Sequence, residues 1–381
     1  MGNLLNVYLN CDRIHASNLT LDHLIIQTPE QPVGPVYEEM GLEIITHKLT
    51  IRGCLVKGRN ASKVNGLCFV NSSNVTLNDV NFYNLNTAII YNCKRDAGAT
   101  STSWTGKHEI SRCWFTDNKK TFAIYDQSFG ANYDMTPPDS ILFHHNTIRE
   151  GIGNEGIVIN KEKVFIKIYN NSVKGKPALE ISNVKTTIPI YNNYLSHFAK
   201  DTLLEPAVKF TNTANHSFIY NSVWGQLSLK SANNLLFRNN SLYDQFQPAL
   251  TMDDQSTLNS DYNNLYSNSP VLATLENTTT GYIQEFPSLD SLKTVTNREQ
   301  HSISYNPYYR SEDLYSNSAY LKNKAIPFGL ITTDFDDKPR NTTAPDIGAS
   351  EIVLLEETVW PGDANAWAGI AAVPRMRNTV H

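Results

Sequence analysis

From residue 19 to residue 265 the apolar positions follow one eight-residue pattern, apolar-x-apolar-x-x-(Asn or apolar)-x-apolar. Its ten copies start at residues 19, 49, 75, 108, 141, 166, 188, 216, 235 and 258, at intervals of 19–33 residues, with departures at His108, His216 and Ser260. Self-similarity at such a period is typical of a solenoid. In a solenoid, a functional site consists of side chains stacked in rows across neighbouring repeats.

Each copy opens with apolar–polar alternation, which predicts a β-strand. A second strand follows in most repeats, usually opened by a small residue, at residues 66–67, 88–90, 123–124, 156–159, 178–181, 207–210, 226–229 and 249–252. Strand, turn, strand and turn in about 22–30 residues describe one coil of a parallel β-helix. A β-propeller blade needs four strands in about 40–45 residues, and a leucine-rich repeat carries its Asn at another offset, so both fit less well.

The sixth position of the pattern changes along the chain. It is Leu24, Cys54, Val80 and Cys113 in the first four copies, and then Asn146, Asn171, Asn193, Asn221, Asn240 and Asn263. A position that accepts Leu, Val and Cys should point into the core, where an amide has to be hydrogen bonded. We therefore predict an internal ladder of stacked asparagines at a corner of the coil. The alternative is that these amides bind a ligand.

Several of these repeats resemble a known family. Ile168-Tyr169-Asn170-Asn171-Ser172-Val173, together with residues 146–151, 156–157 and 236–242, looks like coils of the right-handed parallel β-helix, pectate-lyase-like superfamily. The resemblance implies right-handed coils, in keeping with the usual hand of parallel crossovers. We predict an all-β fold, a right-handed parallel β-helix solenoid of about ten to eleven coils over residues 1–275. This fold hosts lyases, hydrolases, epimerases, adhesins and inert stalks, so it implies no single activity.

The chain changes character after residue 267, where Pro, Tyr and Ser increase. Residues 333–340 and 346–351 are similar to the closing segment of secreted bacterial proteins of the choice-of-anchor Q type, which implies a segment over 276–355 that folds back and seals the last coil. A metal site at its acidic residues is the alternative. Residues 359–366 resemble the start of a dockerin-like calcium loop, but Trp367 and Ala368 stand where an oxygen ligand and a glycine are required. We expect residues 356–381 to form a disordered tail with a truncated dockerin-like start.

Charge and cysteine content narrow the possible partners. A net charge of −5 without any basic run argues against a nucleic-acid partner. The sequence contains no run of about 20 apolar residues that would predict a membrane-spanning segment.

Cys54 and Cys113 occupy the same repeat position two coils apart. That separation is about 9.6 Å, which exceeds the Cα–Cα distance of roughly 7 Å that a disulfide allows. We predict buried free thiols. The resemblance implies an extracellular or cell-surface monomer, and the first residues lack a signal peptide, so we expect the precursor to begin upstream.

The second strands place charged residues in rows. If Ile157, Leu179, Val208, Leu227 and Leu250 face inward, one outward row holds Val158, Glu180, Lys209, Ser228 and Thr251, and the adjoining row holds Asn160, Ser182, Thr211, Lys230 and Asp253. Glu180, Lys209, Lys230 and Asp253 then share one shallow surface. Glu155, Lys161 and Asp254 lie at its edges, and loops at 94–107, 127–139 and 196–206 are candidate walls.

This surface predicts a groove for an acidic polysaccharide. A lyase that cleaves beside a uronate needs a base and a cation that stabilises the developing enolate. Lys209 or Lys230 is the candidate base, Glu180 and Asp253 are candidate calcium ligands, and calcium is the one cofactor that the pattern suggests. The alternative is a solubilising ladder of charges paired across coils. Tyr169 and Tyr191, one coil apart, either stack on sugar rings or pack against each other.

Comparison with β-helix enzymes disfavours catalysis. Residues 155–161 are similar to the Glu and Lys coil of alginate and chondroitin lyases, but the next coil carries Glu180-Ile181-Ser182-Asn183 in place of an Arg-His pair. The aspartate constellation of the polygalacturonases is also missing, since Asp253-Asp254 alone does not match it. We expect a secreted or cell-surface module that binds polysaccharide, a cell-surface glycan or another surface partner without catalysis. A polysaccharide lyase or glycoside hydrolase is the alternative.

Overall fold

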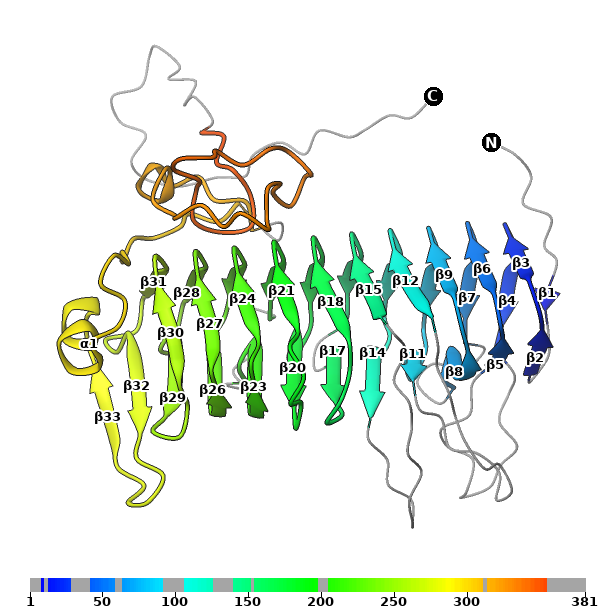
Figure 1. The fold of residues 1–381 in the computed structure, drawn as a ribbon, viewed down its shortest axis with the longest axis horizontal. Coiled ribbons are helices and arrows are strands. Elements are labelled where there is room, and N and C mark those ends of the chain that lie inside the picture. The colour runs from blue at the N-terminus through cyan, green and yellow to red at the C-terminus, as the bar shows by residue number, and fades with distance from the viewer. Residues whose placement is uncertain are drawn as a thin grey trace, which may run out of the picture.

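The chain forms a parallel β-helix built from three long sheets (Figure 1). The computed structural model describes residues 8–9, 13–28, 42–58, 64–91, 106–125, 140–151, 154–197, 205–310 and 314–354. Over these residues it has one α-helix, α1 (Leu289–Thr296), and the short 3-10 helix η2 (Ala319–Leu321). The predicted all-β solenoid is confirmed.

Each complete coil contributes one strand to each sheet, and β33 adds an antiparallel strand to sheet B after the last coil. Sheet A contains β1 (Tyr8–Leu9), β4 (Ile25–Gln27), β7 (Leu55–Lys57), β10 (Asn81–Tyr83), β13 (Trp114–Thr116), β16 (Thr147–Arg149), β19 (Ser172–Lys174), β22 (Tyr194–Ser196), β25 (Ser222–Trp224), β28 (Ser241–Asp244) and β31 (Asn264–Ser267). Sheet B contains β2 (Arg13–Ala16), β5 (Leu42–Thr46), β8 (Leu67–Ser72), β11 (Thr87–Tyr91), β14 (Lys120–Tyr125), β17 (Glu155–Asn160), β20 (Leu179–Ser182), β23 (Val208–Ala214), β26 (Leu227–Asn233), β29 (Leu250–Asp253), β32 (Ala273–Glu276) and β33 (Ile283–Phe286). Sheet C contains β3 (Leu19–Asp22), β6 (Leu49–Arg52), β9 (Val75–Asn78), β12 (Lys107–Ser111), β15 (Ser140–His144), β18 (Ile166–Tyr169), β21 (Pro189–Tyr191), β24 (Ser217–Ile219), β27 (Leu235–Arg238) and β30 (Leu258–Asp261).

The coil therefore has three strands, and the two-strand coil expected from the sequence is wrong. The eight-residue pattern covers a strand of sheet C, a corner and a strand of sheet A, as in β9 followed by β10. The fifth residue of all ten copies has a positive φ of 52–60°, which bends the chain sharply at this corner: His23, Gly53, Asp79, Arg112, His145, Asn170, Asn192, Tyr220, Asn239 and Tyr262. The sixth residue is then turned into the core.

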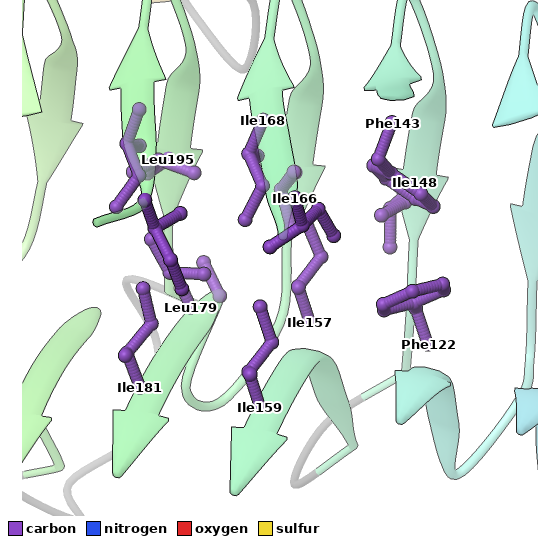
Figure 2. Packing of buried hydrophobic residues seen from close by; sticks show 14 of the residues in the cluster. Phe122, Phe143, Ile148, Ile157, Ile159, Ile166, Ile168, Leu179, Ile181 and Leu195 are labelled. Atoms are coloured by element: carbon purple, nitrogen blue, oxygen red, sulfur yellow. The ribbon is translucent and has the colours of Figure 1, made fainter. Parts of the chain in front are cut away.

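The core is a set of aliphatic and aromatic columns that run along the helix axis. Figure 2 shows Ile157 and Ile159 of sheet B beside Ile166 and Ile168 of sheet C. All four belong to one continuous cluster of buried residues. The predicted inward residues Ile157, Leu179, Val208, Leu227 and Leu250 are buried, with at most 3% exposed. Burying one such side chain contributes about 1.5–3 kcal/mol to the free energy of folding. Because these side chains pack against those of the adjacent coils, each coil is stabilised mainly by its neighbours.

The asparagine ladder is confirmed. Asn171 Oδ1 accepts hydrogen bonds from both the backbone N–H and Nδ2 of Asn146, each at 3.0 Å, and Asn171 Nδ2 donates to Asn193 Oδ1 at 3.0 Å. The same arrangement continues through the remaining members, Asn221, Asn240 and Asn263. At its end the buried Glu299 carboxylate accepts from Asn263 Nδ2 at 3.0 Å, so the last amide is also satisfied. These amides support the fold from inside the coil.

Cys54 and Cys113, the two thiols predicted to be buried and free, lie in the core. Cys54, Cys68 and Cys113 are buried and unbridged, while Cys11 and Cys93 lie outside the described residues. Burial raises the pKa of Cys54, and it raises the pKa of Cys113 to about 12. Cys54 Sγ accepts the backbone N–H of Leu24 at 3.3 Å, which is the position an asparagine oxygen takes in later coils.

The last coil is sealed by the chain that directly follows it. β33 pairs antiparallel with β32, and α1 buries Leu289 and Leu292 against the main core. Ile303 N–H then donates to Asn263 O at 2.9 Å, which pairs the chain with the exposed edge of the last coil. These residues cover the end of the last coil.

The remaining described residues, up to 354, lie along the side of the helix rather than over its end (Figure 1). Arg340 is buried there. Its Nη2 donates to Asn192 Oδ1 at 2.8 Å, and its guanidinium lies 3.9 Å from the ring centre of Tyr220. Asn239 Nδ2 donates to Ile326 O at 2.8 Å. The tail over 356–381 and its dockerin-like start lie outside the described residues.

Candidate functional site

The outer face of sheet B changes from apolar to polar at β20. Cys68, Ile90, Ala123 and Val158 are in register in one row, and each is at most 5% exposed. The next residue of the row is Glu180, which is partly exposed. In this row the accessible side chains therefore begin at β20 and continue toward the last coil.

Over this accessible part, two rows of polar side chains line a hollow of about 550 Å³. The first row, held in register across β20, β23, β26, β29 and β32, is Glu180, Lys209, Ser228, Thr251 and Thr274. The second row contains Thr211 beside Lys230, and Asp253 beside Glu276. The four charged residues singled out from the sequence, Glu180, Lys209, Lys230 and Asp253, thus line the same hollow.

Lys209 is held by a neighbouring carboxylate. Its Nζ lies 2.6 Å from Glu205 Oε2, and this hydrogen bond lowers the pKa of Glu205. Lys209 donates to Glu205 in this arrangement, because a lysine side chain offers only donors to a carboxylate. The geometry places an ion pair at this edge of the hollow.

Asp253 is committed to the turn that follows β29. It is buried, its Oδ2 accepts the backbone N–H of Ser231 at 2.8 Å, and its Oδ1 accepts Ser256 Oγ at 2.6 Å. Both oxygens therefore serve the scaffold. Within the described part of the chain no group of three or more His, Cys, Asp and Glu side chains could hold a metal ion.

Three charged side chains of the hollow remain uncommitted. Among the described residues, Glu180, Lys230 and Glu276 form no ion pair with one another or with a neighbour. Lys230 is exposed, and the two glutamates are partly exposed. Their charges are therefore available to a ligand, whereas those of Lys209 and Asp253 are already engaged.

The edge residues and walls are only partly described. Glu155 pairs with Lys120 at 2.9 Å, Lys161 is buried, and the Asp254 carboxylate accepts Thr278 Oγ1 at 2.7 Å. None of them lines the hollow. The candidate wall loops fall largely outside the described residues, but Glu205 and Pro206, at the end of the third loop, do line it.

Tyr169 and Tyr191 lie on sheet C, away from this hollow. Their rings stack on each other with centroids 5.0 Å apart, and His144 stacks on the other side of Tyr169 at 4.6 Å. Tyr191 also packs against the apolar cluster under the C-terminal segment. Ring faces that are covered by neighbouring rings are not open to a sugar, so the geometry favours packing of these tyrosines against one another.

Sequence reasoning did not extend the two polar rows to β32, and it missed one contact across the chain. Glu276 and Thr274 continue the two rows by one coil, and the alternation of residues 273–276 could have shown it. His145 Nε2 lies 2.9 Å from Asp337 Oδ2, which joins sheet C to the C-terminal segment. No local pattern signals a contact between residues so far apart in sequence.

Comparison with known proteins supports the fold. Residues 134–285 match the family model described as the right handed beta helix region. The matched residues include β15 to β32 and the whole lining of the hollow. The match to this model identifies the parallel β-helix as right-handed. Neither the curated proteins nor the solved structures contain a match to the chain. None of the helices in the described ranges is long and apolar enough to cross a membrane.

Proposed function

We propose that this protein is a non-catalytic β-helix module that binds a glycan chain in the hollow on the outer face of sheet B. The similarity of residues 333–340 and 346–351 to closing segments of secreted bacterial proteins supports a location outside the cell or on its surface. In this proposal the solenoid is a rigid support, and its successive coils present binding groups at regular spacing.

The observation that carries the proposal is the continuity of the polar rows. Across five coils the hollow presents hydroxyl groups of Thr211, Ser228, Thr251 and Thr274 together with the charged groups. A hydroxyl can donate and accept at once, which suits a polyhydroxylated ligand. A linear glycan that lies along the helix axis would meet a hydroxyl or a charged group on every coil, because adjacent strands are only about 4.8 Å apart.

Binding is favoured over cleavage because the groups that chemistry would need are already engaged. Lys209 is paired with Glu205, and both Asp253 oxygens are bonded to the scaffold. Lys230 remains, but it is exposed and forms no ion pair with any of the described residues.

The test is a binding screen of the full chain against pectate, alginate, chondroitin, chitosan and neutral glycans by affinity electrophoresis and calorimetry. Thr251→Tyr places a bulky ring on the floor of the hollow and should weaken binding at least tenfold. Thr50→Tyr is the matched control, since Thr50 has a similar outward position on β6 of sheet C. Equal loss in both variants would contradict a site on sheet B.

The same samples are assayed for new reducing ends and for unsaturated uronates, with and without calcium. We expect no turnover. Robust cleavage that disappears in Lys209→Ala or Lys230→Ala would overturn the proposal in favour of a polysaccharide lyase or glycoside hydrolase.

A further inference from the structure

The lining of the hollow carries an excess of negative charge. Its four carboxylates are those of Glu180, Glu205, Asp253 and Glu276, and its two ammonium groups are those of Lys209 and Lys230. The formal charge of the lining is therefore −2 (2 − 4). Glu285 adds a further exposed carboxylate at the rim, because it is in register with Thr274 on the outer face. The hollow is thus a polar groove with a defined sign of charge.

Most of this negative charge is not neutralised by the protein. The Asp253 carboxylate is satisfied by neutral donors, a backbone N–H and a hydroxyl. Glu180 and Glu276 form no ion pair within the described residues. Of the four lining carboxylates, Glu205 alone pairs with a cation in the described ranges, and that cation is Lys209. A ligand that enters the groove therefore meets uncompensated carboxylates.

Resting on the proposed glycan-binding function, we infer that the ligand is a glycan chain with free amino groups and that polyuronates are excluded. Like charges placed together at an interface repel and suppress wrong partners, whereas opposite charges accelerate association and fix register. The acidic polysaccharide that the sequence alone suggested would bring more carboxylates to Glu180 and Glu276. An ammonium-bearing chain compensates them.

The positions of the two free glutamates agree with a linear ligand. Glu180 lies on β20 and Glu276 on β32, at opposite ends of the hollow. With four strand steps of about 4.8 Å the two lie roughly 19 Å apart along the axis. An oligosaccharide that spans this length can place one ammonium group near each glutamate while its hydroxyls face the threonine and serine rows.

The test compares three linear hexasaccharides of similar length, made of glucosamine, N-acetylglucosamine and galacturonic acid. Binding is measured by calorimetry at about pH 6, above the usual carboxyl pKa of about 4.3, at low and high salt. We expect the glucosamine hexamer to bind at least tenfold more tightly than its acetylated form, with a preference that decreases as salt screens the charges. The galacturonate hexamer should not bind.

The double variant Glu180→Gln/Glu276→Gln should lose the preference for free amino groups but keep its affinity for the acetylated hexamer. Neither glutamate forms an ion pair in the part of the chain that the structure describes, so the thermal midpoint should stay unchanged. Glu162→Gln, at an exposed position outside the hollow, is the matched control. Galacturonate binding as tight as glucosamine binding, or a double variant without effect, overturns the charge assignment and leaves glycan binding standing. Binding of no glycan at all overturns both.

Discussion

Replacement of Asn193 by Ala tests whether the asparagine ladder stabilises the helix. Asn193 is fully buried, its Oδ1 accepts both the N–H and the Nδ2 of Asn171, and its Nδ2 donates to Ile168 O and Tyr191 O at 3.0 Å. Removing the amide leaves the buried Asn171 N–H without an acceptor, which costs about 1–3 kcal/mol, and the lost carbonyl bonds add about 1 kcal/mol. We expect a total loss of about 2–4 kcal/mol.

Two measurements detect this loss of stability, one for the whole protein and one for the coil that contains Asn171. Urea unfolding gives the change in the free energy of unfolding, and hydrogen exchange reports locally on the Asn171 amide, which should lose most of its protection. Local exchange is informative because coils of a solenoid can open separately. Asn259→Ala is the control, since Asn259 is exposed and accepts one surface bond from Arg238, so it should change stability by no more than about 0.5 kcal/mol.

A third variant, Asn193→Cys, separates hydrogen bonding from packing. Cys54 Sγ accepts the Leu24 N–H at the equivalent corner, and Cys113 Sγ donates to Ser111 O at 3.3 Å. A thiol at position 193 should therefore recover part of the stability that alanine loses. If alanine costs less than about 1 kcal/mol and the Asn171 amide stays protected, the ladder is not a stabilising element and the reasoning is refuted.

Three further outcomes follow from other buried sites. Burial raises the pKa of Glu150 to about 7 from 4.5, so folding favours its protonated form; stability should fall by about 3 kcal/mol as pH rises from 4.5 to 7. Glu150→Gln should abolish that difference in urea titrations at several pH values. Arg340→Ala removes the side chain that bonds Asn192, and should make the C-terminal segment at least tenfold more sensitive to limited proteolysis without changing exchange in the coils. Gly225 has φ +129°, and an added Cβ would lie 2.2 Å from His197 Cδ2, so Gly225→Ala should lower the free energy of unfolding by more than about 2 kcal/mol.

The rows on sheet B could be predicted from the sequence because two simple rules determine them. Alternation along a strand decides which side chains face out, and parallel stacking places equivalent residues of neighbouring coils in register. Glu180, Lys209, Ser228 and Thr251 were predicted as one row and are aligned so in the structure. The engagement of Lys209 with Glu205 could not be predicted, since Glu205 belongs to the irregular chain before β23.

The number of strands per coil was not visible in the pattern. The corner between sheets C and A requires a positive φ, and Asn and Gly mark such positions most clearly. Here the same corner is occupied also by His23, Arg112, Tyr220 and Tyr262. Because residue identity at this corner is so variable, the pattern was interpreted as one strand where the chain forms two.

By itself the sequence determined the solenoid, its inward-facing residues and the asparagine ladder, because each depends on a repeat that is local to one coil and copied in the next. Only the tertiary structure decided which outward residues are accessible and which are engaged. The row changes from buried Val158 to accessible Glu180, and Arg340 reaches Asn192 from 148 positions away. Such contacts depend on how irregular segments pack against the regular coils, and no periodic signal along the chain encodes that packing.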